Sequence, residues 1–475
     1  MIKNYKLLNL LLVFFILLVQ LPINAREQNP AVPVTPVTKA ENYVVMISID
    51  GLKPEYYTKA DQYKLKIPNI RMLCREGSFA EGSETIYPSV TYPAHTTLVT
   101  GVRPALHGVF ANQVWLGPEN PRNNDDWYWY AKAIKVPTLW SEARKAGLKT
   151  AAIGWPVTTE GEIDYLVPEI WQGSFDTSFK VSMQKSTPPL AELITKSLPE
   201  PFPNVLNDLV RAQAAITVID NYKPNLLLIH FVEIDFLEHT KGIFSQPVLD
   251  KLEETDAFIG KLIETTKKAG VFDRTSFFIV SDHGFTTVEK QFRPAVLLAK
   301  EGYISLSKEG KLLDWQAIPF GQGGSTAIML KNPDDKATAS KVVELFEKFA
   351  AKPNSPLNRV VKRDQLIKLG ATPEAICFLE PAPGYEINAE LTGELTEKSE
   401  KYKGTHGGLP TRSELYASFI ASGYGIKKGV REPLTKNIHV APTAATLLGF
   451  TMPMAEGHPI REILTVPVPK TRSKR

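Results

Sequence analysis

Three apolar, β-rich runs of this chain each lead into a carboxylate, and no other feature constrains its fold as strongly. The runs and their acids are 43–49 with Asp50, 225–232 with Asp235, and 276–280 with Asp282. Nearly continuous apolar runs are typical of strands buried on both faces of a parallel sheet. Because ligand sites of such sheets lie outside the carboxyl ends of the strands, we expect the three acids to meet at one edge.

The remaining pattern predicts the architecture around these strands. Further candidate strands are 149–154 and 415–421, and helical patterns cover 67–76, 138–146, 203–222, 245–269, 337–351 and 442–448. Alternation of strands and helices over this length favours an α/β fold with a mainly parallel central sheet flanked by helices. The stretch within about 287–403 fits the alternation less well, so we expect an inserted cap there.

The N-terminal segment predicts export. Residues 1–25 have the layout of a secretory signal peptide, with Lys3 and Lys6 before an apolar run and a break at Pro22. An uncleaved membrane anchor is the alternative. After cleavage we expect no stable membrane span, and a periplasmic or secreted protein. We expect residues 26–40 to be a Pro-rich linker, 41–465 to form one large domain and 466–475 to be a basic tail.

Charge and cysteine content exclude two classes of protein. The 55 basic and 51 acidic residues are interspersed and give a net charge of only +4, which gives no case for binding a nucleic-acid polymer. The two cysteines, Cys74 and Cys377, make no disulfide framework. Either they form one bridge, or both are buried free thiols.

Histidines near the three acids indicate a metal centre. Three crowded carboxylates repel one another unless cations lie among them. His283 follows Asp282 directly, and His239 lies four residues after Asp235, on the same face of a helical turn. His406 stands in the glycine-rich segment 404–408. Mixed carboxylate and imidazole ligands suit zinc, whereas an all-oxygen set would favour magnesium or calcium.

A candidate nucleophile precedes a short predicted helix. Pro93 suits the first turn of a helix that runs through Thr100, which places Thr91 at the positive end of that helix. The helix field, and more strongly a bound zinc ion, favour the alkoxide of a hydroxyl placed there. The alternative is that Thr91 simply caps the helix.

Together these motifs resemble the nucleotide pyrophosphatase/phosphodiesterase family of the alkaline phosphatase superfamily. The matching segments, in the family's order, are 49–51, 88–95, 100–101, 107–108 with Asn112, Asp235 with His239, 282–284 and 404–407. The resemblance implies an alkaline phosphatase-like fold and two Zn²⁺ ions. It implies one ion held by Asp50, Asp282 and His283 that also touches Thr91. The other would be held by Asp235, His239 and His406, while Asn112 contacts a phosphoryl oxygen.

The resemblance also implies a reaction. We expect hydrolysis of phosphodiester or pyrophosphate bonds in small, nucleotide-type substrates through a phospho-threonine intermediate at Thr91. After the Trp155–Pro156 element no Lys-x-Arg pair follows, and related threonine-dependent phosphomonoesterases use such a pair to grip a monoester. One alternative is a phosphonoacetate or phosphomonoester hydrolase, because segment 404–408 also resembles phosphonoacetate hydrolases. A catalytically inactive binding protein is the alternative of another class.

Five further histidines and one aromatic cluster lie outside these motifs. The five histidines outside the motifs are interpreted as structural: His95, His107, His230, His439 and His458. The aromatic cluster 127–130 is interpreted either as a surface that stacks on a nucleobase or as packing for an insertion.

Overall fold

The computed structural model describes residues 41–121, 126–171, 175–198 and 207–468. The predicted signal peptide and linker, and most of the predicted basic tail, lie outside these residues, so this division of the chain stays a prediction. Within the described ranges, none of the helices combines the length and the apolar character needed to cross a bilayer.

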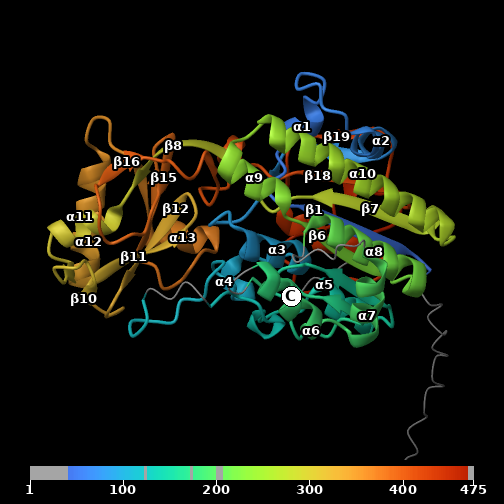
Figure 1. The fold of residues 1–475 in the computed structure, drawn as a ribbon, viewed down its shortest axis with the longest axis horizontal. Coiled ribbons are helices and arrows are strands. Elements are labelled where there is room, and N and C mark those ends of the chain that lie inside the picture. Colours follow the sequence, from blue (N-terminus) through green and yellow to red (C-terminus); the bar gives the residue numbers. More distant parts are fainter. Residues whose placement is uncertain (1–40, 122–125, 172–174, 199–206, 469–475) are drawn as a thin grey trace, which may run out of the picture. The chain divides into compact units, whose positions relative to one another are not determined.

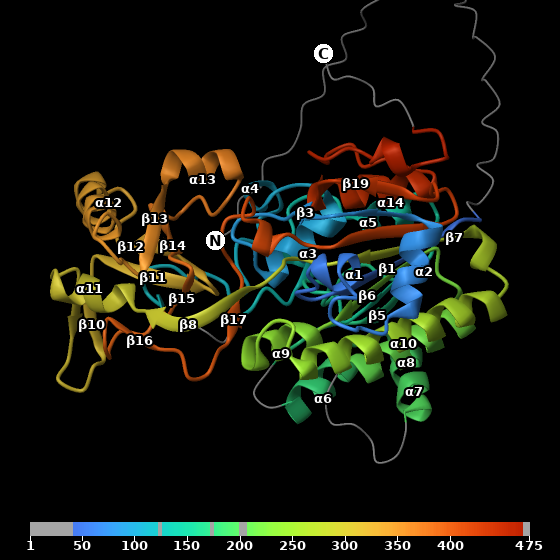
Figure 2. The ribbon, with the colours of Figure 1, turned by 90° about the horizontal axis from the view of Figure 1, so that it is seen from above.

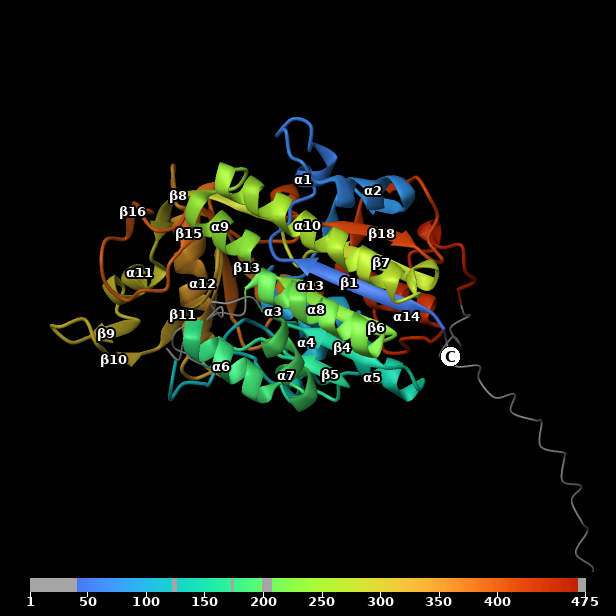
Figure 3. The same cartoon turned by 45° about the vertical axis from the view of Figure 1, so that its right-hand side comes forward.

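An eight-stranded sheet forms the centre of residues 41–468. Its strands are β1 (Tyr43–Ile49), β2 (Ser78–Ala80), β4 (Thr150–Ile153), β5 (Tyr165–Val167), β6 (Leu226–Phe231), β7 (Thr275–Val280), β18 (Phe419–Gly423) and β19 (Val430–Glu432). Their order is β19-β2-β18-β7-β1-β6-β4-β5. The neighbours β7, β1, β6, β4 and β5 all pair in parallel, so β1, β6 and β7 end at one edge (Figure 3). The predicted α/β fold with a mainly parallel sheet is confirmed.

Two layers of helices cover the sheet, because β1 is apolar on both of its faces. Val45, Ile47 and Ile49 pack in a cluster with α2 (Pro68–Glu76), α8 (Asp208–Tyr222) and α10 (Gln246–Lys268). Val44 and Met46 pack in a second cluster with α3 (Thr91–Thr100), α5 (Leu139–Lys145) and α14 (Val440–Leu448). Figure 2 shows α8 and α10 on one side of the sheet and α5 and α14 on the other. Each fully buried side chain of this size contributes about 1.5–3 kcal/mol, so the strand ends are firmly held.

Residues 286–405 form a second group of elements (Figure 1). They are β8 (Thr286–Phe292), α11 (Pro294–Lys300), β9 (Ile304–Leu306), β10 (Leu312–Trp315), β11 (Ala317–Gln322), β12 (Ser325–Leu330), α12 (Lys336–Ala350), β13 (Leu357–Lys362), α13 (Arg363–Leu369), β14 (Cys377–Pro381), β15 (Gly384–Ile387), β16 (Thr396–Lys398) and β17 (Gly404–Thr405). One sheet has the order β11-β12-β14-β13, another the order β15-β8-β16. Phe292, Trp315, Phe346 and Phe378 lie in the apolar core of this group.

The remaining elements connect these two groups or lie at their edges. They are α1 (Glu55–Thr58), β3 (Ser83–Glu84), α4 (Pro104–His107), α6 (Phe175–Lys185), α7 (Pro188–Ser197), α9 (Glu233–Lys241) and β20 (Thr435–Lys436). Helix α8 begins at Asp208, five residues later than predicted, because the side chain of Asn207 caps it by accepting a hydrogen bond from the Val210 amide. Both cysteines are free thiols, with Cys74 half-buried and Cys377 buried.

One predicted strand differs in extent and direction. The run 415–421 suggested a strand of the parallel sheet, but β18 begins only at Phe419 and runs antiparallel to β7. The cause lies in the connection, because the chain reaches β18 from His406, at the edge where the parallel strands end. A strand that begins at that edge has to run in the opposite direction.

Candidate two-metal site

The edge where β1, β6 and β7 end carries two groups of candidate metal ligands. Asp50 follows β1 directly, Asp282 follows β7 by two residues, and Asp235 lies in the first turn of α9, just after β6. The three acids therefore come together as their strands end, and the histidines divide them into two groups.

The first group consists of Asp50, Asp282 and His283, all of them buried. One potential ligand atom from each lies within 4.8 Å of the others. The Nε2 atom of His283 lies 3.0 Å from Oδ2 of Asp282 and 3.5 Å from Oδ1 of Asp50. This is a compact set of two carboxylates and one imidazole.

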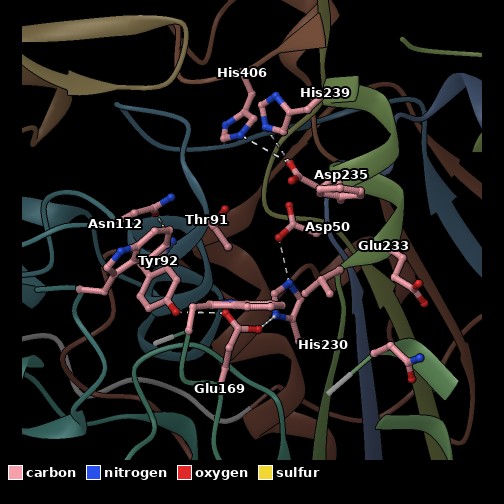
Figure 4. Close-up of a pocket in the computed structure, with 15 residues that line it drawn as sticks. Asp50, Thr91, Tyr92, Asn112, Glu169, His230, Glu233, Asp235, His239 and His406 are labelled. Atoms are coloured by element: carbon pink, nitrogen blue, oxygen red, sulfur yellow. Dashed lines mark hydrogen bonds and ion pairs between the residues drawn. The ribbon is translucent and has the colours of Figure 1, made fainter. Parts of the chain in front are cut away.

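The second group consists of Asp235, His239 and His406 (Figure 4). The Nε2 atoms of both histidines lie 3.5 Å from Oδ1 of Asp235. Their Nδ1 atoms lie 2.9 Å from the Gly404 carbonyl and 3.0 Å from the Ser89 carbonyl, respectively. A carbonyl only accepts, so each Nδ1 carries the proton and each Nε2 keeps a lone pair directed toward the group.

Unsatisfied buried atoms show that a cation fits here. Among the described residues, Oδ1 of Asp50, Oδ1 of Asp235, Oδ2 of Asp282 and both ring nitrogens of His283 are buried without a hydrogen bond. Each such atom costs about 1–3 kcal/mol of folding free energy if nothing compensates it. Metal coordination would compensate, and the mixture of carboxylate oxygen and imidazole nitrogen suits zinc.

The electrostatics of the two groups agree with that fit. Burial and the nearby Asp282 and Asp235 raise the pKa of Asp50 well above its usual value. Burial followed by His283 and His239 lowers the pKa of His406, so its imidazole is neutral, as a metal ligand requires. The rings of His406 and His283 stack with their centroids 3.6 Å apart, so the two groups are in contact.

Thr91 is the first residue of α3 and lines the same pocket as Asp50. The N-cap position belongs to Val90, which has extended backbone angles and no capping side-chain bond. The interpretation of Thr91 as a simple helix cap is therefore wrong, and its hydroxyl has no capping role to fulfil. Pro93 lies in the first turn, where its missing N–H is tolerated.

Asn112 contacts the first turn of α3 at Tyr92, the neighbour of Thr91. Its side-chain Oδ1 accepts a hydrogen bond of 2.9 Å from the backbone N–H of Tyr92. This bond orients the amide and leaves its NH₂ group as a donor for the pocket that Asn112 lines. The arrangement offers a hydrogen-bond donor next to the hydroxyl of Thr91 (Figure 4).

Comparison with known proteins identifies the family. A model of the type I phosphodiesterase/nucleotide pyrophosphatase family matches residues 44–409. The chain belongs to this family. The family expected from the motifs is thus confirmed.

Relatives and solved structures agree with this assignment. Human ectonucleotide pyrophosphatase/phosphodiesterase family member 1 is 23% identical over 86% of this chain and 40% of its own length. The venom phosphodiesterase of Naja atra is 25% identical over 85% of this chain and 44% of its own. This chain thus spans less than half the length of either relative. Mouse ectonucleotide pyrophosphatase/phosphodiesterase family member 7 is 22% identical over 88% of this chain and 86% of its own length. The structure of human ectonucleotide pyrophosphatase/phosphodiesterase family member 5 shares the fold, with a TM-score of 0.62. It is 19% identical and is matched over 88% of this chain and 96% of its own chain.

This phosphodiesterase-family chain contains a buried network that the sequence interpretation missed. His230 contacts Oδ2 of Asp50 through Nε2 at 3.0 Å, and Oε2 of Glu169 through Nδ1 at 3.0 Å. Arg211 donates to the same Glu169 oxygen at 2.8 Å, and the Tyr92 hydroxyl donates to Oε1 at 3.1 Å. His230 thus holds one oxygen of Asp50 and leaves the other for the first group. The only sequence signal was a polar histidine inside an apolar run.

The other histidines outside the motifs lie in neither group. His95 is buried, with Nδ1 2.9 Å from the Thr91 carbonyl and Nε2 2.8 Å from the Ser48 hydroxyl. His107 contacts the hydroxyl of Thr97 at 3.1 Å. The remaining two, His439 and His458, contact each other at 3.0 Å.

An aromatic wall completes a pocket of about 530 Å³ around Thr91. Tyr92, Trp127, Trp171 and Phe236 line it, together with residues of both metal-ligand groups. In the cluster 127–130, Trp127 both lines the pocket and packs within the cluster. Its ring stacks on that of Trp129, with centroids 5.4 Å apart. None of the described lining residues is a lysine or an arginine.

Proposed function

We propose that this chain hydrolyses phosphodiester or pyrophosphate bonds of small, nucleotide-type molecules, with two zinc ions and Thr91 as the nucleophile. One observation carries the proposal: two groups of candidate metal ligands, each with at least one unsatisfied buried atom, lie next to a helix-start hydroxyl that does not cap its helix. Membership of the phosphodiesterase family supports the reaction class. Asp50, Asp282 and His283 would hold one ion, and Asp235, His239 and His406 the other.

The ions, when bound, supply Lewis-acid chemistry that lowers the pKa of a neighbouring hydroxyl and neutralises phosphoryl charge. The chain contributes positioning. Thr91 attacks phosphorus in line, from the first turn of α3, where the helix dipole favours developing negative charge. Asn112 donates a hydrogen bond to a non-bridging oxygen, which gains charge in the transition state. A phospho-threonine forms at Thr91, and water then hydrolyses it.

The composition of the pocket supports diesters over monoesters. A monoester carries one more negative charge than a diester, and enzymes that grip it use cationic side chains. The described lining residues offer no lysine or arginine for such a grip. The aromatic wall provides flat surfaces for a nucleobase or a similar group.

We also propose that the protein acts outside the cytoplasm, in the periplasm or after secretion. The proposal rests on the predicted signal peptide of residues 1–25. The relatives include a venom phosphodiesterase and ectonucleotide phosphodiesterases, whose names place them outside the cell. Fractionation of cells that express the full chain, followed by N-terminal sequencing, tests both export and cleavage.

A rate comparison on purified, zinc-loaded protein tests the reaction. The substrates are p-nitrophenyl phosphate, bis-p-nitrophenyl phosphate, p-nitrophenyl thymidine monophosphate and phosphonoacetate. We expect the two diesters to be preferred, with the nucleotide ester fastest. A preference for the monoester or phosphonoacetate would retain the zinc and Thr91 but overturn the substrate assignment. Protein that binds no zinc and cleaves nothing would be an inactive binding protein.

A further inference from the structure

A second cavity adjoins the second group of metal ligands. Its volume is about 770 Å³, and it lies between α9 and the small sheet β15-β8-β16. Phe236 and His239 line both this cavity and the pocket around Thr91. Thr405, the neighbour of the ligand His406, also lines it. The two hollows therefore meet at the Asp235, His239 and His406 group.

Polar side chains make up more of the second cavity's wall than of the first pocket's, although Phe236, Ile387 and Tyr402 also line it. Asn388 donates to the side chain of Gln291 at 2.6 Å, and Ser399 donates to Glu386 at 3.0 Å. These side chains line the cavity together with Thr240. Asn388, Gln291, Ser399 and Thr240 offer neutral donors and acceptors at a surface where an acyl chain would leave polar atoms unsatisfied.

The charges of the second cavity disfavour an anionic occupant. Arg293 is buried and ion-paired with both Glu390 and Glu397. Among the described lining residues, the other cation is Lys401, against a third acid, Glu386. Since the acids outnumber the cations, a di- or triphosphate leaving group would be repelled, whereas hydroxyl groups can both donate to carboxylates and accept from amides.

In-line attack by Thr91 requires the leaving oxygen to lie on the far side of phosphorus. The Nδ1 atom of His95 lies 2.9 Å from the Thr91 carbonyl and 3.7 Å from Oδ2 of Asp282, so Thr91 is next to the Asp50 group. The far side is then the Asp235, His239 and His406 group. The group that departs therefore extends past His239, whereas the group that stays on phosphorus lies against the aromatic wall. We propose that the second cavity is the leaving-group subsite and takes an uncharged polyhydroxylated group, such as a sugar or another polyol.

The inference rests on the proposed function and specifies its substrate class. The Thr91 hydroxyl gives a proton to solvent and regains one when the phospho-threonine is hydrolysed. The bond between the Thr91 oxygen and phosphorus forms as the bond from phosphorus to the polyol oxygen breaks, and the polyol oxygen leaves as an alcohol after taking a proton from water. The hydroxide equivalent that remains then hydrolyses the phospho-threonine. The net reaction consumes one water and yields the polyol and the phosphomonoester of the retained half.

Two esters of thymidine 5′-phosphate that differ only in the leaving group test the subsite. One carries p-nitrophenol and the other glucose, linked through its 6-hydroxyl. The variant Asn388→Leu removes a donor and an acceptor from the cavity at similar volume. We expect the ratio of kcat/KM for the glucose ester to kcat/KM for the p-nitrophenyl ester to fall about tenfold, as loss of one or two hydrogen bonds predicts.

Asn358→Leu is the matched control, since Asn358 is exposed on β13 and does not line the cavity. If Asn388→Leu does not fold, Thr240→Val replaces it, because this change removes a single hydroxyl from the cavity wall. The subsite is overturned if the cavity variant that folds, Asn388→Leu or its replacement Thr240→Val, leaves this ratio within twofold of wild type. Wild-type protein that cleaves the p-nitrophenyl ester but not the glucose ester also overturns it. Failure on both esters overturns the proposed function itself.

Discussion

Glu169→Gln is the most informative perturbation of the buried network behind Asp50. Glu169 is almost fully buried and contacts Arg211, His230 and the Tyr92 hydroxyl. Burial alone would raise its pKa, but His230 and Arg211 outweigh burial and lower the pKa to about 2 from the usual 4.5. A shift of this size corresponds to about 3 kcal/mol of unfolding free energy at neutral pH.

The sign of this contribution fixes its pH dependence. A carboxyl whose pKa is lower in the folded protein contributes fully above the unfolded pKa. The contribution should therefore be complete above about pH 4.5 and disappear as the pH falls toward about 2. At pH 7, Glu169→Gln keeps the volume but loses the charge, so urea unfolding should show a loss of about 3 kcal/mol.

The same change should weaken zinc binding, because His230 loses the partner that holds it against Asp50. Side chains that orient a metal ligand typically contribute about 10–100-fold in affinity, and competition with a chromophoric chelator measures this. The control is Glu192→Gln, whose partner Lys196 lies at 2.6 Å in an exposed pair. An exposed pair contributes about 0–1 kcal/mol. If Glu169→Gln matches this control in both stability and zinc affinity, the role assigned to the network is refuted.

Three further predictions concern the site directly. Thr91→Ala should abolish diester hydrolysis while the zinc content, measured by elemental analysis, stays at two per chain; residual turnover comparable to wild type would exclude Thr91 as the nucleophile. Asn112→Ala should lower kcat by about 10²–10³-fold with KM for p-nitrophenyl thymidine monophosphate changed much less, since its hydrogen bond strengthens in the transition state. Chelation of zinc should lower the thermal midpoint, and added zinc should restore it in proportion to the logarithm of its concentration; a midpoint indifferent to zinc would contradict the fit of the two groups.

The sequence predicted the sheet edge because its signal is local. Asp50 comes directly after a buried strand and Asp282 two residues after another, and the relation between parallel strand ends and ligand sites needs no tertiary detail. His239 followed from its helical spacing to Asp235. In contrast, Asn112 was identified only through resemblance, since an asparagine in a loop carries no pattern of its own.

The features that escaped prediction depend on contacts between distant segments. Glu169 and Arg211 lie 42 residues apart, and only the packed fold shows that they share a buried ion pair. The direction of β18 depends on where the chain re-enters the sheet after β17. The second cavity combines side chains of α9 with those of β8 and β15, so no single run of residues indicates it.

His406 differs from the other candidate ligands in where it comes from. It follows β17, which pairs with β8 and so belongs to the second group of elements, whereas Asp235 and His239 lie on a helix that follows the central sheet. An ion bound by all three would close a loop of about 170 residues, and in the chain-entropy description a cross-link of that span stabilises by about 5 kcal/mol. The ion would then act as a reversible staple between the cavity-forming segment and the sheet. Metal supply would thereby set both whether the protein can react and how firmly its leaving-group subsite is assembled.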